Sequence, residues 1–251
     1  MSSLPETRTM VVEVLRYQPD KAEAPYTEKF EVPFTDDMSV LQGLQYIKDH
    51  FDGSLTFRWS CRMAICGSCG VMIDGVPSLG CKTFMRDYWP KGFRVEALAH
   101  FPIERDLVVD ATDFIDKLPR IEPWIEPPKE KALAEGEYLQ SPQQLEKFES
   151  FSHCINCMLC YAACPQYGLE QKFLGPGLTA LAHRYKADSR DGEHAARDEL
   201  IHSTEGVWNC TAVGYCSEVC PKHVDPANAV NQNKTASALG WFSRVIPGGR
   251  R

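Results

Sequence analysis

Two related cysteine runs in the second half of the chain constrain its fold more than any other feature. The first run has four cysteines at gaps of two, two and three residues, followed directly by a proline: Cys154, Cys157, Cys160 and Cys164. The second run keeps this frame from Cys210 to Cys220, with Cys216 as its third cysteine and again a closing proline. Val213 stands where the second cysteine of that run would be, so the two runs supply unequal numbers of thiols.

This spacing is typical of bacterial two-cluster ferredoxins, in which the fourth cysteine of each run binds the cluster of the other run. Sharing the cysteines in this way predicts a 4Fe-4S cluster with four ligands: Cys154, Cys157, Cys160 and Cys220. The other cluster then receives only Cys164, Cys210 and Cys216. Because Val213 cannot coordinate iron, we expect a 3Fe-4S cluster there. The alternative is a 4Fe-4S cluster whose fourth iron takes water or a ligand other than cysteine.

A third group of cysteines lies in the first half of the chain and consists of Cys61, Cys66, Cys69 and Cys81. Its opening gaps of four and two residues match the plant-type ferredoxins, in which four thiolates hold a 2Fe-2S cluster. Gly67 and Gly70 suit a loop that wraps closely around such a cluster, because glycine tolerates positive φ angles and close approach. The alternative is a zinc knuckle, but zinc sites usually show two matched cysteine pairs, which this group lacks.

Composition limits the environment and the partners of the chain. Eleven cysteines without a recognisable export signal favour thiols that bind metal in a reducing compartment over a disulfide framework. No stretch approaches the roughly 18 apolar residues of a membrane-spanning helix, so we expect any membrane contact to be peripheral. The 34 acidic residues exceed the 27 basic ones, and we therefore expect no nucleic acid as a partner.

The first half of the chain shows strand and helix signals of a small mixed domain. Residues 10–17 and 27–34 are rich in β-branched and aromatic residues and predict a hairpin. Ser39 is suited to cap a helix whose apolar face would consist of Leu41, Leu44, Ile47 and Phe51. The Asp74–Gly75 pair predicts a second hairpin.

The second half reads as short helices around cysteine loops, after a connector rich in proline and charge. Helical composition is found in residues 142–153, 176–188 and 226–239. The predicted fold class is therefore α+β, with three segments: a 2Fe-2S ferredoxin domain at 1–105, a connector at 106–142 and a helical two-cluster domain at 143–251. Three clusters without an evident substrate pocket, nucleophile or nucleotide loop indicate an electron carrier that needs a partner with the reacting cofactor. A zinc-stabilised binding module or scaffold is the alternative from a different class.

The chain resembles the iron-sulfur subunit of the succinate dehydrogenase and fumarate reductase family. The resemblance covers nearly the whole chain and is carried by Arg58–Cys69, Phe101–Asp110 and Asp188–Asp191, together with the cysteine groups. It implies a β-grasp ferredoxin domain followed by an all-α two-cluster domain. It also implies a position between a flavoprotein subunit with FAD and a membrane anchor subunit, peripheral on the cytoplasmic side of the cell inner membrane. Electrons would pass between FAD and quinone through the 2Fe-2S, 4Fe-4S and 3Fe-4S clusters in that order.

Within the family the motifs are more similar to fumarate reductase. Leu169 and Thr211 stand where ubiquinone-using succinate dehydrogenases typically carry tryptophan and histidine, which favours menaquinone. The resemblance places five residues near the quinone: Pro165, Thr211, Ala212, Asn231 and Lys234. The Lys234 ammonium would hydrogen-bond a quinone oxygen, although a solvated lysine is the simpler alternative. Two further alternatives are a succinate dehydrogenase acting in the opposite direction with menaquinone and a soluble flavin-linked fumarate reductase subunit.

Overall fold

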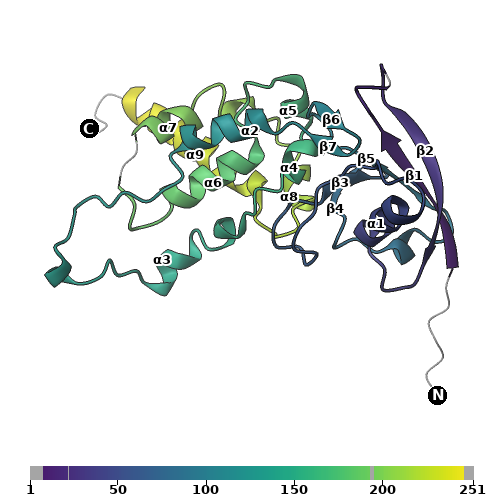
Figure 1. The fold of residues 1–251 in the computed structure, drawn as a ribbon. Helices are drawn as coiled ribbons and strands as arrows, with labels where there is room; N and C mark the ends of the chain where they lie inside the picture. Colours follow the sequence, from purple (N-terminus) through teal and green to yellow (C-terminus); the bar gives the residue numbers. More distant parts are fainter. Residues whose placement is uncertain (1–7, 22, 193–194, 246–251) are drawn as a thin grey trace. The chain divides into compact units, whose positions relative to one another are not determined.

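The computed structural model of the chain describes residues 8–21, 23–192 and 195–245 (Figure 1). Its contacts divide the chain into two compact units. The first unit contains the residues up to Ala111 together with Ile155–Ala163. The second unit contains Thr112–Cys154 together with the residues from Cys164 onward.

These units and the three predicted segments divide the chain differently. Ile155–Ala163 carries two cysteines of the first run and lies inside the predicted last domain, yet it belongs to the first unit. The second unit also begins at Thr112, within the predicted connector 106–142. Residues 1–7, on which the expected lack of an export signal depends, lie outside the described residues.

The first unit contains a five-stranded sheet, a small two-stranded sheet and three short helical elements. The strands are β1 (Arg8–Arg16), β2 (Tyr26–Phe34), β3 (Gly70–Ile73), β4 (Val76–Leu79), β5 (Phe93–Glu96), β6 (Ile103–Arg105) and β7 (Val108–Val109). The helices are α1 (Val40–His50), the 3₁₀-helix η1 (Met85–Tyr88) and α4 (Leu159–Ala162).

The larger sheet has the strand order β2-β1-β5-β3-β4. Strands β1 and β2 form the predicted antiparallel hairpin, in which Arg8 lies opposite Phe34, and β5 runs parallel to β1. Strands β3 and β4 form the second predicted hairpin around the Asp74–Gly75 turn, where both residues have positive φ angles. Alternate residues of β1, among them Val12 and Val14, are buried in the core beneath α1.

Helix α1 begins where the sequence predicts. The Ser39 side chain accepts a hydrogen bond from the Gln42 backbone, and the Gln42 side chain bonds back to the Ser39 backbone, which makes a capping box. Leu44 and Ile47 are buried against the sheet as expected. The prediction was wrong for Phe51, which is 52 % exposed, because the helix ends at His50 and Phe51 lies at its C-cap, beyond the last buried turn.

The second unit is helical. Its α-helices are α2 (Thr112–Lys117), α3 (Pro142–Glu146), α5 (Pro165–Leu169), α6 (Pro176–Lys186), α7 (Ala195–Ile201), α8 (Tyr215–Glu218) and α9 (Pro226–Val245). Its 3₁₀-helices are η2 (Leu118–Ile121), η3 (Leu133–Glu135), η4 (Ser150–His153) and η5 (Val207–Asn209).

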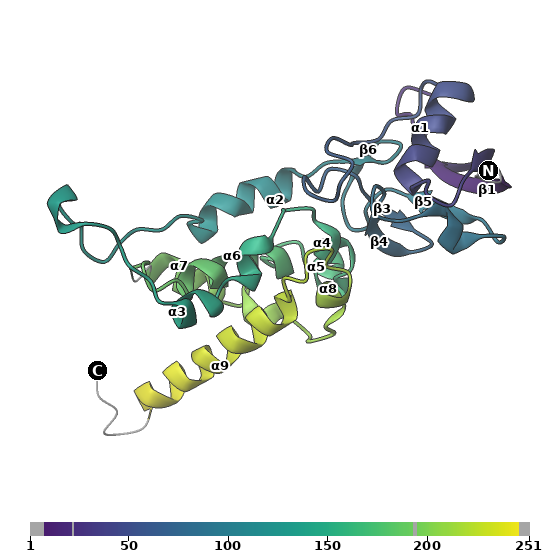
Figure 2. The ribbon, with the colours of Figure 1, turned by 90° about the horizontal axis from the view of Figure 1, so that it is seen from below.

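Helix α6 is the centre of the second unit. It packs against α9, α7 and η4, and Figure 2 shows α9 running beside it. Phe151, Ala180, Val224 and Ala229 form a buried apolar cluster between these elements. The cysteine loops of this unit are therefore held by short helices that share one core.

A buried arginine fastens the connector to this unit. Arg197 of α7 donates to the backbone carbonyls of Ile121, Glu122 and Trp124 at 3.0, 2.7 and 3.1 Å. Its guanidinium also pairs with Asp191 at 2.6 Å, and both side chains are 2 % exposed. Residues 122–142 of the connector include no buried residue, so these polar contacts hold the start of that stretch in place.

No helix within the described part of the chain combines the length and the apolar character that crossing a membrane would require.

Candidate iron-sulfur sites

The loop around Cys61 directs its backbone amides at a sulfur atom. The N–H groups of Met63, Ile65 and Cys66 lie 3.4, 3.3 and 3.3 Å from Cys61 Sγ. Hydrogen bonds to a thiolate stabilise its negative charge, so this loop is built to hold an anionic sulfur. The positive φ of 59° at Arg62 belongs to the bend that brings these amides together.

The other cysteines of this group extend the same pattern. The N–H of Ala64, whose φ is 57°, lies 3.3 Å from Cys81 Sγ, and the N–H of Cys61 lies 3.5 Å from Cys66 Sγ. The backbone N–H of Cys61, followed by the hydroxyl of Ser68, lowers the pKa of Cys66 to about 6. Burial raises the pKa of Cys69 to about 12. Because iron binds thiolates, loading this site would release a proton from Cys69.

These observations fit a 2Fe-2S cluster. None of the eleven cysteines forms a disulfide, so all thiols of this group are available as ligands. Within the described residues, no three histidine, cysteine, aspartate or glutamate side chains form a group that could hold a metal ion. In a 2Fe-2S cluster the four thiolates are shared between two irons, two on each.

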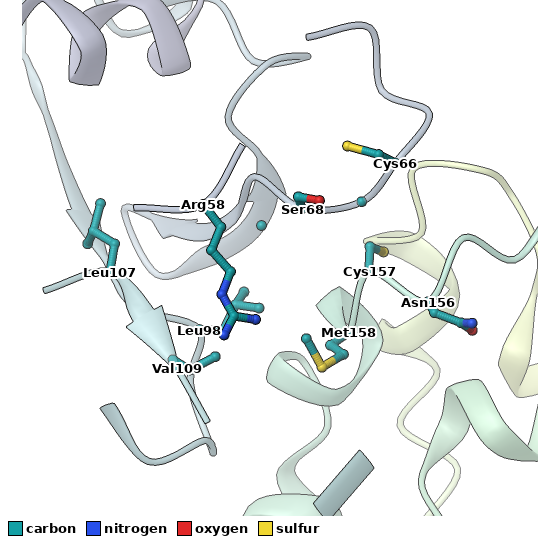
Figure 3. A pocket seen from close by; sticks show the side chains of 11 residues that line it. Arg58, Cys66, Ser68, Leu98, Leu107, Val109, Asn156, Cys157 and Met158 are labelled. Carbon is teal, nitrogen blue, oxygen red and sulfur yellow. The ribbon is translucent and has the colours of Figure 1, made fainter. Parts of the chain in front are cut away.

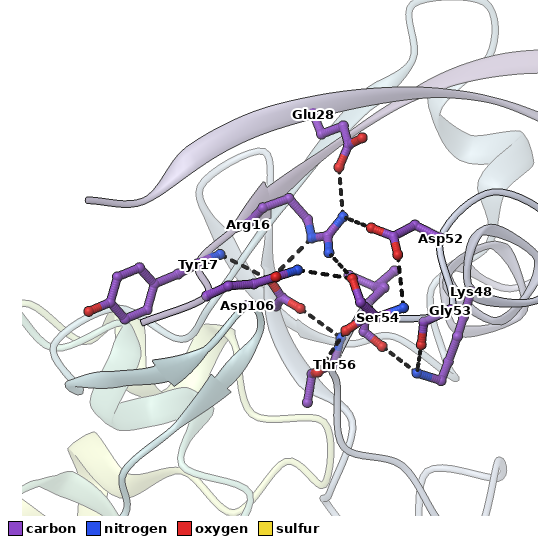
Figure 4. Close-up of polar contacts among 11 residues, drawn as sticks. Arg16, Tyr17, Glu28, Lys48, Asp52, Gly53, Ser54, Thr56 and Asp106 are labelled. Atoms are coloured by element: carbon purple, nitrogen blue, oxygen red, sulfur yellow. Dashed lines mark hydrogen bonds and ion pairs between the residues drawn. The ribbon is translucent and has the colours of Figure 1, made fainter. Parts of the chain in front are cut away.

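A buried ion network holds the segment that leads into this loop (Figure 4). Asp106 accepts from the Arg16 guanidinium at 3.1 Å and from the backbone N–H groups of Tyr17 and Thr56 at 2.9 and 2.8 Å. Arg16 is fully buried and also bonds Asp52 at 2.7 Å. Hydrogen bonds from Ser54, followed by the bond from Arg16, keep the pKa of Asp52 well below its usual range. The end of β1 and the start of the cluster loop are thus joined through charged groups.

The first cysteine run places Cys157 in a turn of unusual backbone. Its neighbours Asn156 and Met158 have left-handed φ angles of 53° and 63°. The 3₁₀-helix η4 ends before this turn and α4 begins directly after it. Left-handed φ is rare for a residue such as methionine, so the turn is a specific feature of the run.

The second run repeats this backbone around Val213. Its neighbours Ala212 and Gly214 have left-handed φ angles of 60° and 84°, after η5 and directly before α8. Val213 therefore occupies the position of Cys157 in a loop of the same form. Its side chain is 61 % exposed, so no apolar core explains a valine there.

The three cysteines predicted to bind the terminal cluster all belong to the second unit and interact electrostatically. Burial, followed by repulsion from Cys164 and Cys210, raises the pKa of Cys216 to about 11. Burial also raises the pKa of Cys164, with Cys210 adding repulsion. The Ala212 N–H lies 3.3 Å from Cys210 Sγ. Three close thiols that repel one another as thiolates are suited to a group of iron cations, so these residues fit a cluster.

The cysteines predicted to bind the middle cluster are distributed over both units. Cys154 and Cys220 pack against the same apolar cluster of the second unit, and the Val224 N–H lies 3.4 Å from Cys220 Sγ. Cys157 and Cys160 belong to the first unit. Their grouping into one 4Fe-4S site therefore stays a prediction.

The residues predicted near the quinone lie in the second unit around the start of the second run. The Lys234 ammonium donates to the Cys210 carbonyl at 2.7 Å and is half-buried, so it is not a freely solvated lysine. Asn231 is exposed three residues earlier on α9, and Thr211 and Ala212 are exposed directly after Cys210.

Pro165 is exposed at the first position of α5. The next residue, Gln166, donates to Asn209 Oδ1 at 2.6 Å, and this bond draws the start of α5 to the residue before Cys210. Trp208, which the sequence analysis did not single out, is 50 % exposed, and Lys234 Nζ lies 5.9 Å from the centre of its ring. The sequence signal that could have identified Trp208 is its position two residues before the predicted cluster ligand Cys210.

Comparison with known families agrees with a 2Fe-2S cluster domain in the first half of the chain and a two-cluster domain in the second half. The family described as 2Fe-2S iron-sulfur cluster binding domain matches residues 11–116. The family described as 4Fe-4S dicluster domain matches residues 150–224. Together they confirm the predicted α+β class, with a sheet-containing 2Fe-2S ferredoxin domain followed by a helical two-cluster domain.

Two curated relatives and one solved structure extend the comparison to nearly the whole chain. The fumarate reductase iron-sulfur subunit of Haemophilus influenzae is 54 % identical over 247 residues, covering 94 % of this chain and 96 % of the relative. The Escherichia coli subunit of the same name is 54 % identical over 241 residues, covering 96 % and 98 %. A chain of the Mycobacterium smegmatis Sdh1 complex in the apo form aligns with a TM-score of 0.87 at 26 % identity, covering 96 % of this chain and 100 % of that one.

Proposed function

Because this chain belongs to the iron-sulfur subunits of the fumarate reductase and succinate dehydrogenase family, we propose that it carries electrons between FAD in a flavoprotein subunit and a quinone at a membrane anchor. Its role as the electron-transferring iron-sulfur subunit follows from the family. The partners, the quinone and the direction are the parts that we propose. The clusters, when bound, supply one-electron steps between two-electron reactions at either end.

The terminal cluster is the central element of this proposal, and the backbone around Val213 supports it. A loop with the form of the Cys157 loop, but without a thiol at that position, offers three cysteines where its counterpart offers four. We therefore assign a 3Fe-4S cluster to Cys164, Cys210 and Cys216. These three cysteines would hold the cluster, and Lys234 would face the quinone.

Lys234 is positioned for this task by its bond to the Cys210 carbonyl. That bond keeps the ammonium beside the cluster loop, and an ammonium can donate to more than one acceptor. A quinone oxygen within reach would receive a charge-assisted hydrogen bond that strengthens as the oxygen gains negative charge. Asn231, Thr211, Ala212 and Pro165 would border the ring.

Exposed apolar side chains support two docking faces, one in each unit. On the loop of the first cluster, Trp59, Met63 and Ile65 are 43 %, 70 % and 55 % exposed and would contact the flavoprotein subunit. In the second unit, Trp208 and Val213 are exposed beside the predicted quinone residues and would contact the membrane anchor. The chain would then sit peripherally on the cytoplasmic side of the inner membrane.

Fumarate reduction with menaquinone is the direction that we propose, because the two relatives described above, each 54 % identical, are named as fumarate reductase subunits. Succinate oxidation with menaquinone is the second candidate, supported by the fold shared with the Sdh1 complex. Assays of the purified complex in both directions, with a menaquinone and a ubiquinone analogue, decide between them. Faster succinate oxidation with the ubiquinone analogue would overturn the assignment.

Metal analysis and EPR spectroscopy test the clusters themselves. We expect about nine irons per chain, the sum of a 2Fe, a 4Fe and a 3Fe cluster. The oxidised complex should show a 3Fe-4S signal at low temperature, which a 4Fe-4S cluster with a water ligand would not give. Stoichiometric zinc in a colourless protein would instead favour a zinc-stabilised module. If activity with quinone survives removal of the anchor subunit, the result would favour a soluble flavin-linked fumarate reductase subunit.

A further inference from the structure

A glycine brings the loop of the first cluster against a cysteine of the first run. Gly67 directly follows Cys66, belongs to the first unit and has a φ angle of +74°. A Cβ atom added to Gly67 would lie 2.9 Å from Cβ and 3.1 Å from Cα of Cys157, and 3.0 Å from the carbonyl oxygen of Ile155. Side chains do not pack at such distances, so glycine alone permits this approach.

The same two segments meet again beside this contact. A Cβ atom on Gly70 would lie 3.2 Å from Leu159 Cδ2 and 3.4 Å from the Cys157 carbonyl oxygen. A cavity of about 180 Å³ adjoins both contacts, and Figure 3 shows Cys66 and Cys157 on the neighbouring segments that line it. The loop of the first cluster thus touches the Cys157 segment through two residues without side chains.

On the proposed function, Cys66 and Cys157 bind neighbouring clusters. We propose that the contact between Gly67 and Cys157 is the route by which an electron crosses between these clusters, and that position 67 requires glycine because a side chain would widen the gap. The crossing would transfer one electron from the 4Fe-4S cluster to the 2Fe-2S cluster during fumarate reduction, and the reverse during succinate oxidation, without forming or breaking a bond. Because tunnelling slows steeply with distance, a displacement of Cys157 away from the loop of the first cluster should slow the crossing.

The Gly67→Ala variant in the assembled complex tests this role. We expect iron content and the EPR signals of both clusters to persist, while the magnetic interaction between the two reduced clusters weakens. Electron flow from succinate to quinone should fall relative to flow into a dye that accepts electrons from the flavin. Gly75→Ala is the matched control, because Gly75 has a φ of +79° but no atom within 4 Å of an added Cβ.

A second variant covers the case in which Gly67→Ala loses the 2Fe-2S cluster. In Gly70→Ala the added Cβ would lie 3.2 Å from Leu159 Cδ2 and 3.4 Å from the Cys157 carbonyl oxygen, without a positive φ angle. This variant should therefore displace the Cys157 segment by less than Gly67→Ala and weaken the magnetic interaction by a smaller amount, without straining the cluster loop. Unchanged magnetic interaction and unchanged electron flow, in a variant that retains both clusters, would overturn the proposed route. Absence of the cluster signals from the unaltered complex would instead contradict the proposed function on which this inference rests.

Discussion

Val213 occupies in the second cysteine run the backbone position that Cys157 occupies in the first. Each lies between two residues with left-handed φ angles, after a 3₁₀-helix and directly before a short α-helix. The two loops therefore differ at this position in chemistry rather than in form. A cysteine placed at position 213 should therefore be able to bind iron without a change in the backbone of the loop.

We expect Val213→Cys to convert the terminal cluster to the 4Fe-4S type. The added thiolate would stand where Cys157 stands in the related loop and would bind the fourth iron. EPR of the oxidised complex should lose its 3Fe-4S signal, and iron content should rise by one atom per chain. Val213→Ala, which adds no ligand, should retain the signal. A full 3Fe-4S signal in Val213→Cys would show that the two runs are not equivalent at this position.

Lys234→Ala should impair the reaction with quinone while leaving the clusters intact. The variant removes both the bond to the Cys210 carbonyl and the proposed donor to the quinone, and loss of such a donor typically lowers turnover by about 10²-fold. Steady-state kinetics with a menaquinone analogue measure the effect, and EPR verifies the clusters. Lys234→Arg keeps a positive donor at this site and should recover part of the activity. Unchanged quinone kinetics in Lys234→Ala would assign this residue a purely structural role.

Arg197→Ala should destabilise the second unit by about 3–5 kcal/mol, because it removes the guanidinium that pairs with the buried Asp191 carboxylate and that donates to three backbone carbonyls. The midpoint of thermal unfolding of the complex measures this effect. Arg120→Ala is the control, because Arg120 pairs with Glu205 at 2.9 Å with both side chains 40–45 % exposed. Such exposed pairs contribute about 1 kcal/mol or less. Equal shifts in the two variants would mean that the Arg197 network does not support the fold.

His183 should make stability depend on pH below neutrality. Burial lowers its pKa from 6.5 to about 4. The Asn233 amide donates to the Ala229 carbonyl at 2.8 Å and lies 3.0 Å from His183 Nδ1, so it donates to that nitrogen and the ring is held neutral. Between these two pKa values the unfolded chain binds a proton that the folded chain does not bind.

The contribution of His183 is therefore complete above pH 6.5 and is lost as the pH falls towards 4, by about 3 kcal/mol in total. His183→Gln retains an acceptor for the Asn233 amide and does not titrate in this range. Thermal midpoints of the two proteins, measured from pH 7 to pH 5, should diverge in slope, with the smaller dependence in His183→Gln. Parallel curves would contradict a neutral buried His183.

The local elements of the fold were predictable because their signals lie within a few residues. The hairpins and the Ser39 cap depend on alternation, turn residues and a capping box, all of which are short-range. The error at Phe51 has a tertiary cause, because the apolar spacing continues past the residue at which the helix ends. The fastening of the connector by Arg197 could not be read from the sequence, since its acceptors are backbone carbonyls more than 70 residues away.

The site divides in the same way. Cysteine spacing predicted the ligand groups and the gap at Val213, because coordination by a loop depends on gaps of two to four residues. The similar form of the loops around Cys157 and Val213 could be recognised only from the φ angles of their neighbouring residues in the structure.

By itself, the sequence determined which thiols are present, how they are spaced, and that the thiol expected at position 213 is missing. Iron coordination by a loop depends on such short spacings. The tertiary structure alone decided that Gly67 touches Cys157 and that Lys234 bonds the Cys210 carbonyl. These contacts join residues 90 and 24 positions apart in the chain. Packing of distant segments creates them, and no local pattern of residues specifies which backbone atoms such packing will bring together.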